Sequence, residues 1–140
     1  MNSNPPLNDE LRRLIEARME HTLKAIEDML QRILEEHEIL LEDLKKTIQS
    51  LEKSFSLLSQ KWNLEILYSL FLRKSMCFSG LKKILGVNSR TLSDKLKILK
   101  QFGYIERMIE QGPPLRVIYS LTVKGRNTVL LALPLLYYSA

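Results

Sequence analysis

The sequence predicts a mainly α-helical fold with one small β-hairpin, in which a long N-terminal helix precedes a helix-turn-helix unit. Three observations predict it. After Pro5-Pro6 the chain has no proline until Pro113 and no glycine before Gly80. Apolar residues recur at helical spacing along most of the chain. Two short runs rich in β-branched and aromatic residues flank a turn-forming segment in the last third of the sequence.

Charge is unevenly distributed along the 140 residues. Residues 1–60 carry 8 Lys/Arg and 12 Asp/Glu, a net charge of −4, whereas residues 61–140 carry 13 Lys/Arg and 4 Asp/Glu, a net charge of +9, which together give +5. A strongly basic second half indicates a polyanionic partner. The acidic first half indicates a role other than binding the polyanion.

Composition narrows the class of protein further. Cys77 is the only cysteine, which excludes an intrachain disulfide and zinc-finger spacing. The longest apolar run, residues 129–138, is ten residues long and contains Pro134, so it is too short to span a bilayer. The first residues also lack the features of a signal peptide. We therefore expect a soluble, cytoplasmic protein without a membrane partner, a metal site or a cofactor.

Residues 1–58 are predicted to form one coiled-coil dimerisation helix. A continuous helix of about fifty residues extends about 75 Å and cannot bury an apolar stripe against its own domain. A homodimer would cover it, and a hairpin folded back around Gln49-Ser50 is the alternative. His37 is expected to fix the register rather than to bind a metal. The residues of this stripe, which we call the seam, are spaced alternately three and four apart, with one extra step of four: Leu23, Ile26, Leu30, Ile33, His37, Leu40, Leu44, Ile48, Leu51 and Phe55.

After the seam the sequence predicts a core helix, followed by two further helices that are joined by a turn. The segment from Gln60 is expected to start a core helix anchored by Trp62. Ser79 is expected to cap the next helix, residues 80–85, in which Leu81, Ile84 and Leu85 face inward. Gly86 then makes the turn into the second helix. A helix, a short glycine-containing turn and a helix are the arrangement of a helix-turn-helix.

The helix at residues 89–102 has the most informative pattern. Leu92, Leu96 and Leu99 lie on one face, with Ser89 as the expected N-cap and Gly103 as the left-handed residue after the helix. Opposite the leucines lie Arg90, Asp94, Lys97 and Gln101. A leucine-backed helix with a polar, basic outer face suits the major groove of DNA, although a plain solvated face shows the same pattern.

A β-hairpin is predicted over residues 104–121, with its tip at residues 110–115. A final helix then begins after Thr122, as its cap, and ends near Pro134. The apolar residues of the C-terminal segment, residues 127–140, are expected to pack on the dimer interface.

Several motifs occur in a specific order between residues 61 and 126. They are Lys61-Trp62, Phe78-Ser79-x-Leu81, Gly86-Val87-x-Ser89-Arg90-Thr91-Leu92-Ser93, Gly103-Tyr104-Ile105-Glu106-Arg107 and Pro114-x-Arg116-Val117-x-Tyr119-Ser120-Leu121-Thr122. This order resembles winged helix-turn-helix regulators of the HxlR and MarR type. The resemblance implies a DNA-binding domain at residues 59–126, with residues 104–121 as the wing, in a dimeric transcription factor. The long N-terminal segment resembles the dimerisation helix of small archaeal regulators.

The resemblance and the residue types together suggest the DNA contacts. Arg90 is expected to be the principal base reader, because its planar guanidinium can bind guanine through two hydrogen bonds. Asp94 would orient Arg90 or accept a hydrogen bond from cytosine. The alternative interpretation is that Asp94 is a surface carboxylate without a role in DNA binding. Lysines are expected to bind phosphates, and Arg107 and Arg116 to contact a phosphate or the minor groove. The expected DNA-binding residues are Ser89, Arg90, Thr91, Ser93, Asp94, Lys97, Lys82, Lys83, Lys95, Arg107 and Arg116.

The leading prediction is a sequence-selective transcriptional regulator. An architectural, weakly selective DNA-binding protein and a coiled-coil protein-interaction adaptor are the alternatives. An enzyme is not expected, because no nucleophile, phosphate-binding loop or metal spacing is recognisable. The sequence names no small-molecule effector. Cys77 has two interpretations, a small buried hydrophobe and a reactive thiol.

Overall fold

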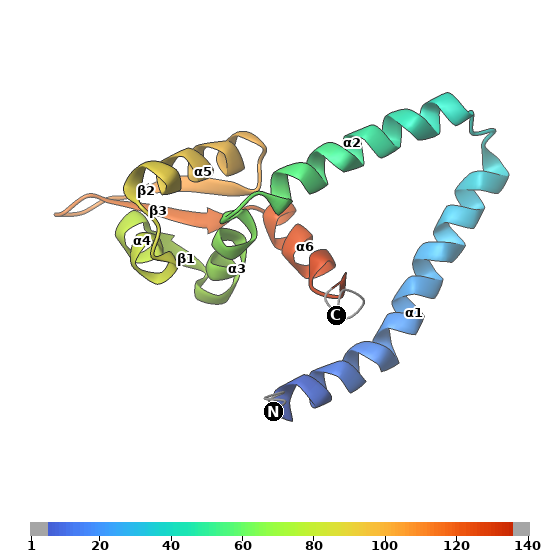
Figure 1. Cartoon of the computed structure of the whole chain (residues 1–140), viewed down its shortest axis with the longest axis horizontal. Helices are drawn as coiled ribbons and strands as arrows, with labels where there is room; N and C mark the ends of the chain where they lie inside the picture. Colours follow the sequence, from blue (N-terminus) through green and yellow to red (C-terminus); the bar gives the residue numbers. More distant parts are fainter. Residues whose placement is uncertain (1–5, 136–140) are drawn as a thin grey trace. The chain divides into compact units, whose positions relative to one another are not determined.

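The predicted balance of many helices and one small sheet is confirmed by the computed structural model, which describes residues 6–135. The described part contains α1 (Pro6–Glu36), α2 (Leu41–Ser59), α3 (Asn63–Arg73), β1 (Ser75–Cys77), α4 (Phe78–Leu85), α5 (Ser89–Gln101), β2 (Ile105–Glu110), β3 (Arg116–Leu121) and α6 (Val123–Ala132) (Figure 1). The chain divides into two units, and the second unit, Glu52–Leu133, holds the helix-turn-helix formed by α4 and α5. No helix within residues 6–135 has the length and apolar character needed to cross a membrane.

The N-terminal segment is two helices, so the prediction of one uninterrupted helix was wrong. The chain leaves helical geometry between Glu36 and Leu41, and the seam residues His37 and Leu40 lie in this link. The link between the two helices contains no proline or glycine, and the charges at the helix ends explain the break. The last turn of α1 has no basic residue and ends in Glu35-Glu36, which opposes the helix dipole, whereas acidic residues in the first turn of α2 favour a new start.

The junction between α2 and α3 is held by Asn63 rather than by Trp62. Asn63 is fully buried, and its side-chain Nδ2 donates to the Leu57 carbonyl oxygen at 2.7 Å. Trp62 is only half-buried and adopts a left-handed backbone with φ of 79°, so it precedes the helix and packs on the edge of the core. Trp62 therefore packs against the core as expected, but from its edge and from a position before the helix.

Helix α4 also begins earlier than predicted. Its N-cap is Cys77, which makes no side-chain capping bond, so the proposed cap at Ser79 was wrong. Leu81 is fully buried as expected and Leu85 is half-buried, but Ile84 is 51% exposed and does not face the core. The left-handed turn after the helix is made by Gly86, with φ of 66°.

The three strands form one antiparallel sheet in the order β1-β3-β2. Residues 75–77 pair with residues 118–120 of β3, which adds a strand to the predicted hairpin. Strands β2 and β3 pair over their whole length, with Ile105 opposite Leu121 and Glu110 opposite Arg116. The far end of this hairpin projects away from the surrounding helices (Figure 1). The predicted wing is confirmed.

The core of the second unit is made of residues from nearly every one of its elements. The predicted leucine stripe of α5 is confirmed, since Leu92 and Leu99 are fully buried and Leu96 is 2% exposed. Tyr68 of α3 donates its hydroxyl hydrogen to the Val129 carbonyl oxygen at 3.2 Å, and its burial raises the pKa of the phenol. The other buried apolar residues are Leu57, Ile66, Leu67, Leu70, Leu81, Val87, Tyr104, Ile105 and Val129.

Helix α6 is fastened to the loop after α5 by a cap and a close approach. Thr122 is the N-cap, as predicted, because its Oγ1 accepts from the Gly125 N–H at 3.0 Å. The Thr122 hydroxyl also donates to the Gly103 carbonyl oxygen. Gly125 lies directly against the Tyr104 backbone, where a Cβ would come within 2.0 Å of the carbonyl oxygen. Part of the predicted apolar C-terminal segment, residues 136–140, lies outside the described residues.

Replacing Gly125 by alanine should destabilise the second unit by about 2–3 kcal/mol, because the Tyr104 backbone has to move to admit the methyl group. Urea unfolding followed by the fluorescence of Trp62 measures this. Gly80→Ala is the matched control, because its new Cβ meets only side-chain atoms at 3.5 Å or more. Equal unfolding free energies for the two variants would contradict the close approach.

Candidate nucleic-acid interface

The N-terminus of α5 is fixed by Asn88. The Asn88 backbone is extended, and its side-chain oxygen accepts from the Thr91 N–H at 2.8 Å. Ser89 already belongs to the helix, so the predicted cap at Ser89 was wrong by one residue. The other end agrees with the prediction, because Gly103 has a left-handed φ of 81°. These two ends and the buried leucines determine which face of α5 reaches solvent.

The outward face of α5 carries most of the side chains expected to contact DNA. Ser89, Arg90, Asp94 and Lys97 are exposed, while Thr91 and Ser93 are half-buried on its flanks. Arg90 and Asp94 form no ion pair with each other or with any other described residue. The guanidinium of Arg90 is therefore not held by an intramolecular partner in this structure.

Some cations of the second unit are used within the fold. Lys124 donates to the Phe102 carbonyl oxygen at 2.7 Å and lies over the Tyr104 ring. Arg126 lies over Phe71, and Lys61 lies over Trp62. Lys95 is half-buried and donates to the Gln60 side-chain oxygen at 3.1 Å, which makes it the weakest of the expected DNA contacts.

Other cations have no partner within residues 6–135. Those on α4, on α5 and on the first wing strand form no hydrogen bond, ion pair or ring contact with a described residue, and in the second unit the same holds for Lys53, Arg73 and Lys74. Five of the expected DNA contacts belong to this set, and Lys100 was not among the predictions. We call the six on α4, α5 and the first wing strand the unpaired cations: Lys82, Lys83, Arg90, Lys97, Lys100 and Arg107.

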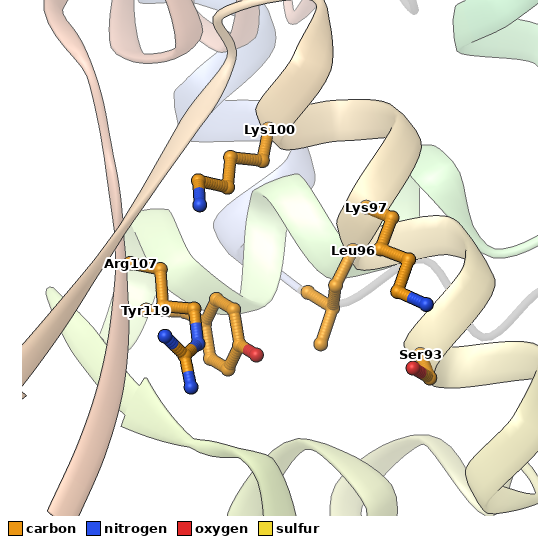
Figure 2. A pocket seen from close by; sticks show the side chains of 6 residues that line it. All are labelled: Ser93, Leu96, Lys97, Lys100, Arg107 and Tyr119. Atoms are coloured by element: carbon orange, nitrogen blue, oxygen red, sulfur yellow. The ribbon is translucent and has the colours of Figure 1, made fainter.

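A pocket of about 370 Å³ lies between α5 and the wing. Helix α5 contributes four lining residues, and β2 and β3 contribute one each (Figure 2). Arg107 and Tyr119 are directly opposite each other in the strand pairing, which places both on the face of the hairpin that lines the pocket. Sequence reasoning missed Lys100 and Tyr119 as site residues. The lining residues, which define the α5–wing pocket, are Ser93, Leu96, Lys97, Lys100, Arg107 and Tyr119.

Cys77 lies at the start of α4, beside the wing strand β3. Its thiol is half-buried, and its Sγ is 3.3 Å from the Ser79 hydroxyl. Hydrogen bonds from Ser79 and from the Gly80 backbone lower the pKa of the thiol, and Arg116 adds a smaller effect in the same direction. Cys77 is thus not the fully buried hydrophobe of one interpretation. Arg116, which flanks the wing as predicted, lies near the thiol.

Comparison with known proteins gives a consistent result for the second unit. The model of the HxlR-like helix-turn-helix family matches residues 57–135. YdzF of Bacillus subtilis (strain 168), described as an HTH-type transcriptional regulator, is 38% identical over 77 residues, which are 54% of this chain and 71% of YdzF. YodB of the same organism, also an HTH-type transcriptional regulator, is 33% identical over 75 residues, 54% of this chain and 67% of YodB.

Solved structures show the same likeness. The reduced form of YodB from B. subtilis superimposes with a TM-score of 0.61 at 27% identity and covers 64% of this chain and 88% of YodB. A transcriptional regulator of the MarR family from Enterococcus faecalis V583 gives a TM-score of 0.57 at 28% identity, with 64% and 81% covered.

Removing the Asn88 cap should destabilise α5 more than removing the Ser89 hydroxyl. Asn88→Ala should cost about 1 kcal/mol of unfolding free energy, because the Thr91 N–H loses its acceptor. Ser89→Ala is the adjacent control and should change stability much less. Urea unfolding of the two variants measures the difference, and a larger loss for Ser89→Ala would contradict the observed cap.

Proposed function

Because this chain belongs to the HxlR-like helix-turn-helix family and is a transcriptional regulator of that type, we propose that it binds double-stranded DNA sequence-selectively as a homodimer. In this proposal α5 enters the major groove, and the wing contacts the backbone or the minor groove. The relatives are transcriptional regulators, and we propose no catalytic role, cofactor or metal for this chain. A cytoplasmic location fits such a regulator.

The observation that carries the DNA proposal is that every cation of α4 and β2, and three of the four cations of α5, have no partner among the described residues. Lys61, Lys95, Lys124 and Arg126 have partners inside the second unit. The unpaired cations have no such contacts, so their charged groups are available to a partner outside the second unit. Phosphates and base edges both attract such groups, and a helix whose opposite face is buried can present them to one groove.

Within α5 the proposal divides the work between two residues. Arg90 lies in the first turn of the helix, where recognition helices contact base edges, so it is our candidate for reading sequence. Lys97 lies two turns later and suits a phosphate, which positions the protein without specifying sequence. Ser89, Thr91, Ser93, Asp94, Lys82, Lys83, Lys95, Arg107 and Arg116 complete the proposed interface.

The dimer proposal is supported by the apolar surface of α1 and α2. Leu23, Ile26, Leu30 and Ile33 of α1 are 39–52% exposed. Leu44, Ile48, Leu51 and Phe55 of α2 are likewise exposed, at 44–53%. Repeated leucine and isoleucine at this spacing is stabilised by a partner helix, which a second copy supplies. We propose that residues 1–58 provide the dimer contacts and that the apolar end of α6, where Leu131 is 70% exposed, joins them.

Arg90→Ala and Lys97→Ala should affect DNA binding differently. On a duplex selected from a random library by the unmodified chain, Arg90→Ala should cost about 1–3 kcal/mol and reduce the preference over random competitor. Lys97→Ala should weaken both duplexes equally and make binding less dependent on salt. Competition binding at several salt concentrations measures both effects. An unmodified chain without preference would favour the architectural alternative, and unchanged affinity in both variants would favour the adaptor.

Leu30→Glu should convert the dimer to a monomer, because a carboxylate would be buried in the proposed seam. Gln31→Glu introduces the same group one position away, outside the seam, and should leave the dimer intact. Sedimentation equilibrium of both variants at matched concentrations measures the mass. A monomeric unmodified chain would contradict the homodimer.

A further inference from the structure

The α5–wing pocket gathers positive charge without any acidic side chain in its lining. Three of its six residues are unpaired cations, Lys97, Lys100 and Arg107. The hydroxyl groups of Ser93 and Tyr119 also have no hydrogen-bond partner within the part of the chain that the structure describes. The pocket therefore offers several donors to one occupant, and its positive potential favours an anion.

The cations reach the pocket from two facing walls. Lys97 and Lys100 are three residues apart on α5 and so lie on neighbouring turns of the same side of the helix. Arg107 comes from β2 on the other wall, and in Figure 2 its guanidinium and the ammonium group of Lys100 lie on the same side of Leu96, whereas the ammonium group of Lys97 points away from them. A phosphate group has enough oxygens to accept from a planar guanidinium and from an ammonium group at once.

The floor of the pocket is apolar, which favours an occupant that carries carbon atoms as well as a charged group. Leu96 lies there with 2% of its surface exposed, beside the half-buried ring of Tyr119. A volume of about 370 Å³ is that of a small-molecule site and leaves room beyond a bare phosphate. Carbon atoms that carry the phosphate could pack on this floor while the oxygens face the cations.

We propose that the α5–wing pocket binds a phosphate group together with the sugar that carries it. The sugar phosphate can belong to the DNA backbone or to a free nucleotide or sugar phosphate. The DNA source rests on the proposed function, because the pocket lies between the two elements assigned to DNA there. Binding of a free nucleotide or sugar phosphate does not depend on the proposed function. Such a ligand in this pocket would compete with DNA for the same cations.

The first experiment uses the full chain without DNA. Deoxyribose 5-phosphate is titrated at constant ionic strength, with deoxyribose as the neutral control, and binding is followed by calorimetry and by the NMR signals of the Tyr119 ring. The double variant Lys100→Gln/Arg107→Gln should lose about tenfold or more in affinity. The double variant Lys45→Gln/Lys46→Gln removes the same charge from α2 and should bind like the unmodified chain. Circular dichroism checks that both variants are folded.

The second experiment compares duplex DNA binding by the same two double variants. A loss of about tenfold or more that is specific to Lys100→Gln/Arg107→Gln identifies the DNA backbone as a source. Saturable binding of deoxyribose 5-phosphate that this variant loses identifies a free source, and displacement of DNA by it shows that both use one pocket. If the titration does not saturate and the two variants bind DNA equally, the proposal is overturned. If the chain binds no DNA, the proposed function is wrong. The titration with deoxyribose 5-phosphate then still tests whether the pocket binds a sugar phosphate.

Discussion

The burial of Leu92, Leu96 and Leu99 is the contact on which the rest of the second unit's surface depends. Each buried leucine contributes about 2 kcal/mol, so the stripe outweighs the cap at Asn88, which contributes about 1 kcal/mol. A rotation of α5 would expose leucines and bury charged residues. The stripe therefore fixes Arg90 and Lys97 on the solvent side, and it fixes which residues of α5 can face the wing.

The sheet supplies the other wall of this surface. Pairing of β2 with β3 places Arg107 opposite Tyr119, and the packing of Gly125 against Tyr104 holds α6 at the base of the hairpin. Helix α5 and the wing are consequently parts of one packed unit. A charged pocket between them is a product of this packing, since neither element has it alone.

The sequence predicted those features that depend on local periodicity. The leucine stripe, the hairpin and the Thr122 cap follow from spacing and residue type, and the structure agrees with them. The break after Glu36 has no glycine or proline to indicate it, and its signal in the sequence is the unfavourable charge at the end of α1. Asn88 and Ser89 are both good caps, and the backbone geometry selects Asn88. Strand register places Tyr119 opposite Arg107, and the packing of α5 against the wing brings Lys100 to the same pocket. A single sequence specifies neither the register nor this packing.

The central claim is that two leucine-backed copies of α5 enter the major groove of one duplex. Methylation of guanine N7 blocks the major-groove edge that Arg90 is proposed to contact, so methylation interference on a selected duplex tests the claim directly. The account predicts two groups of interfering guanines about one helical turn apart, and both groups should lose interference in Arg90→Ala. A bound duplex without N7 interference, or with a pattern that Arg90→Ala leaves unchanged, would contradict it.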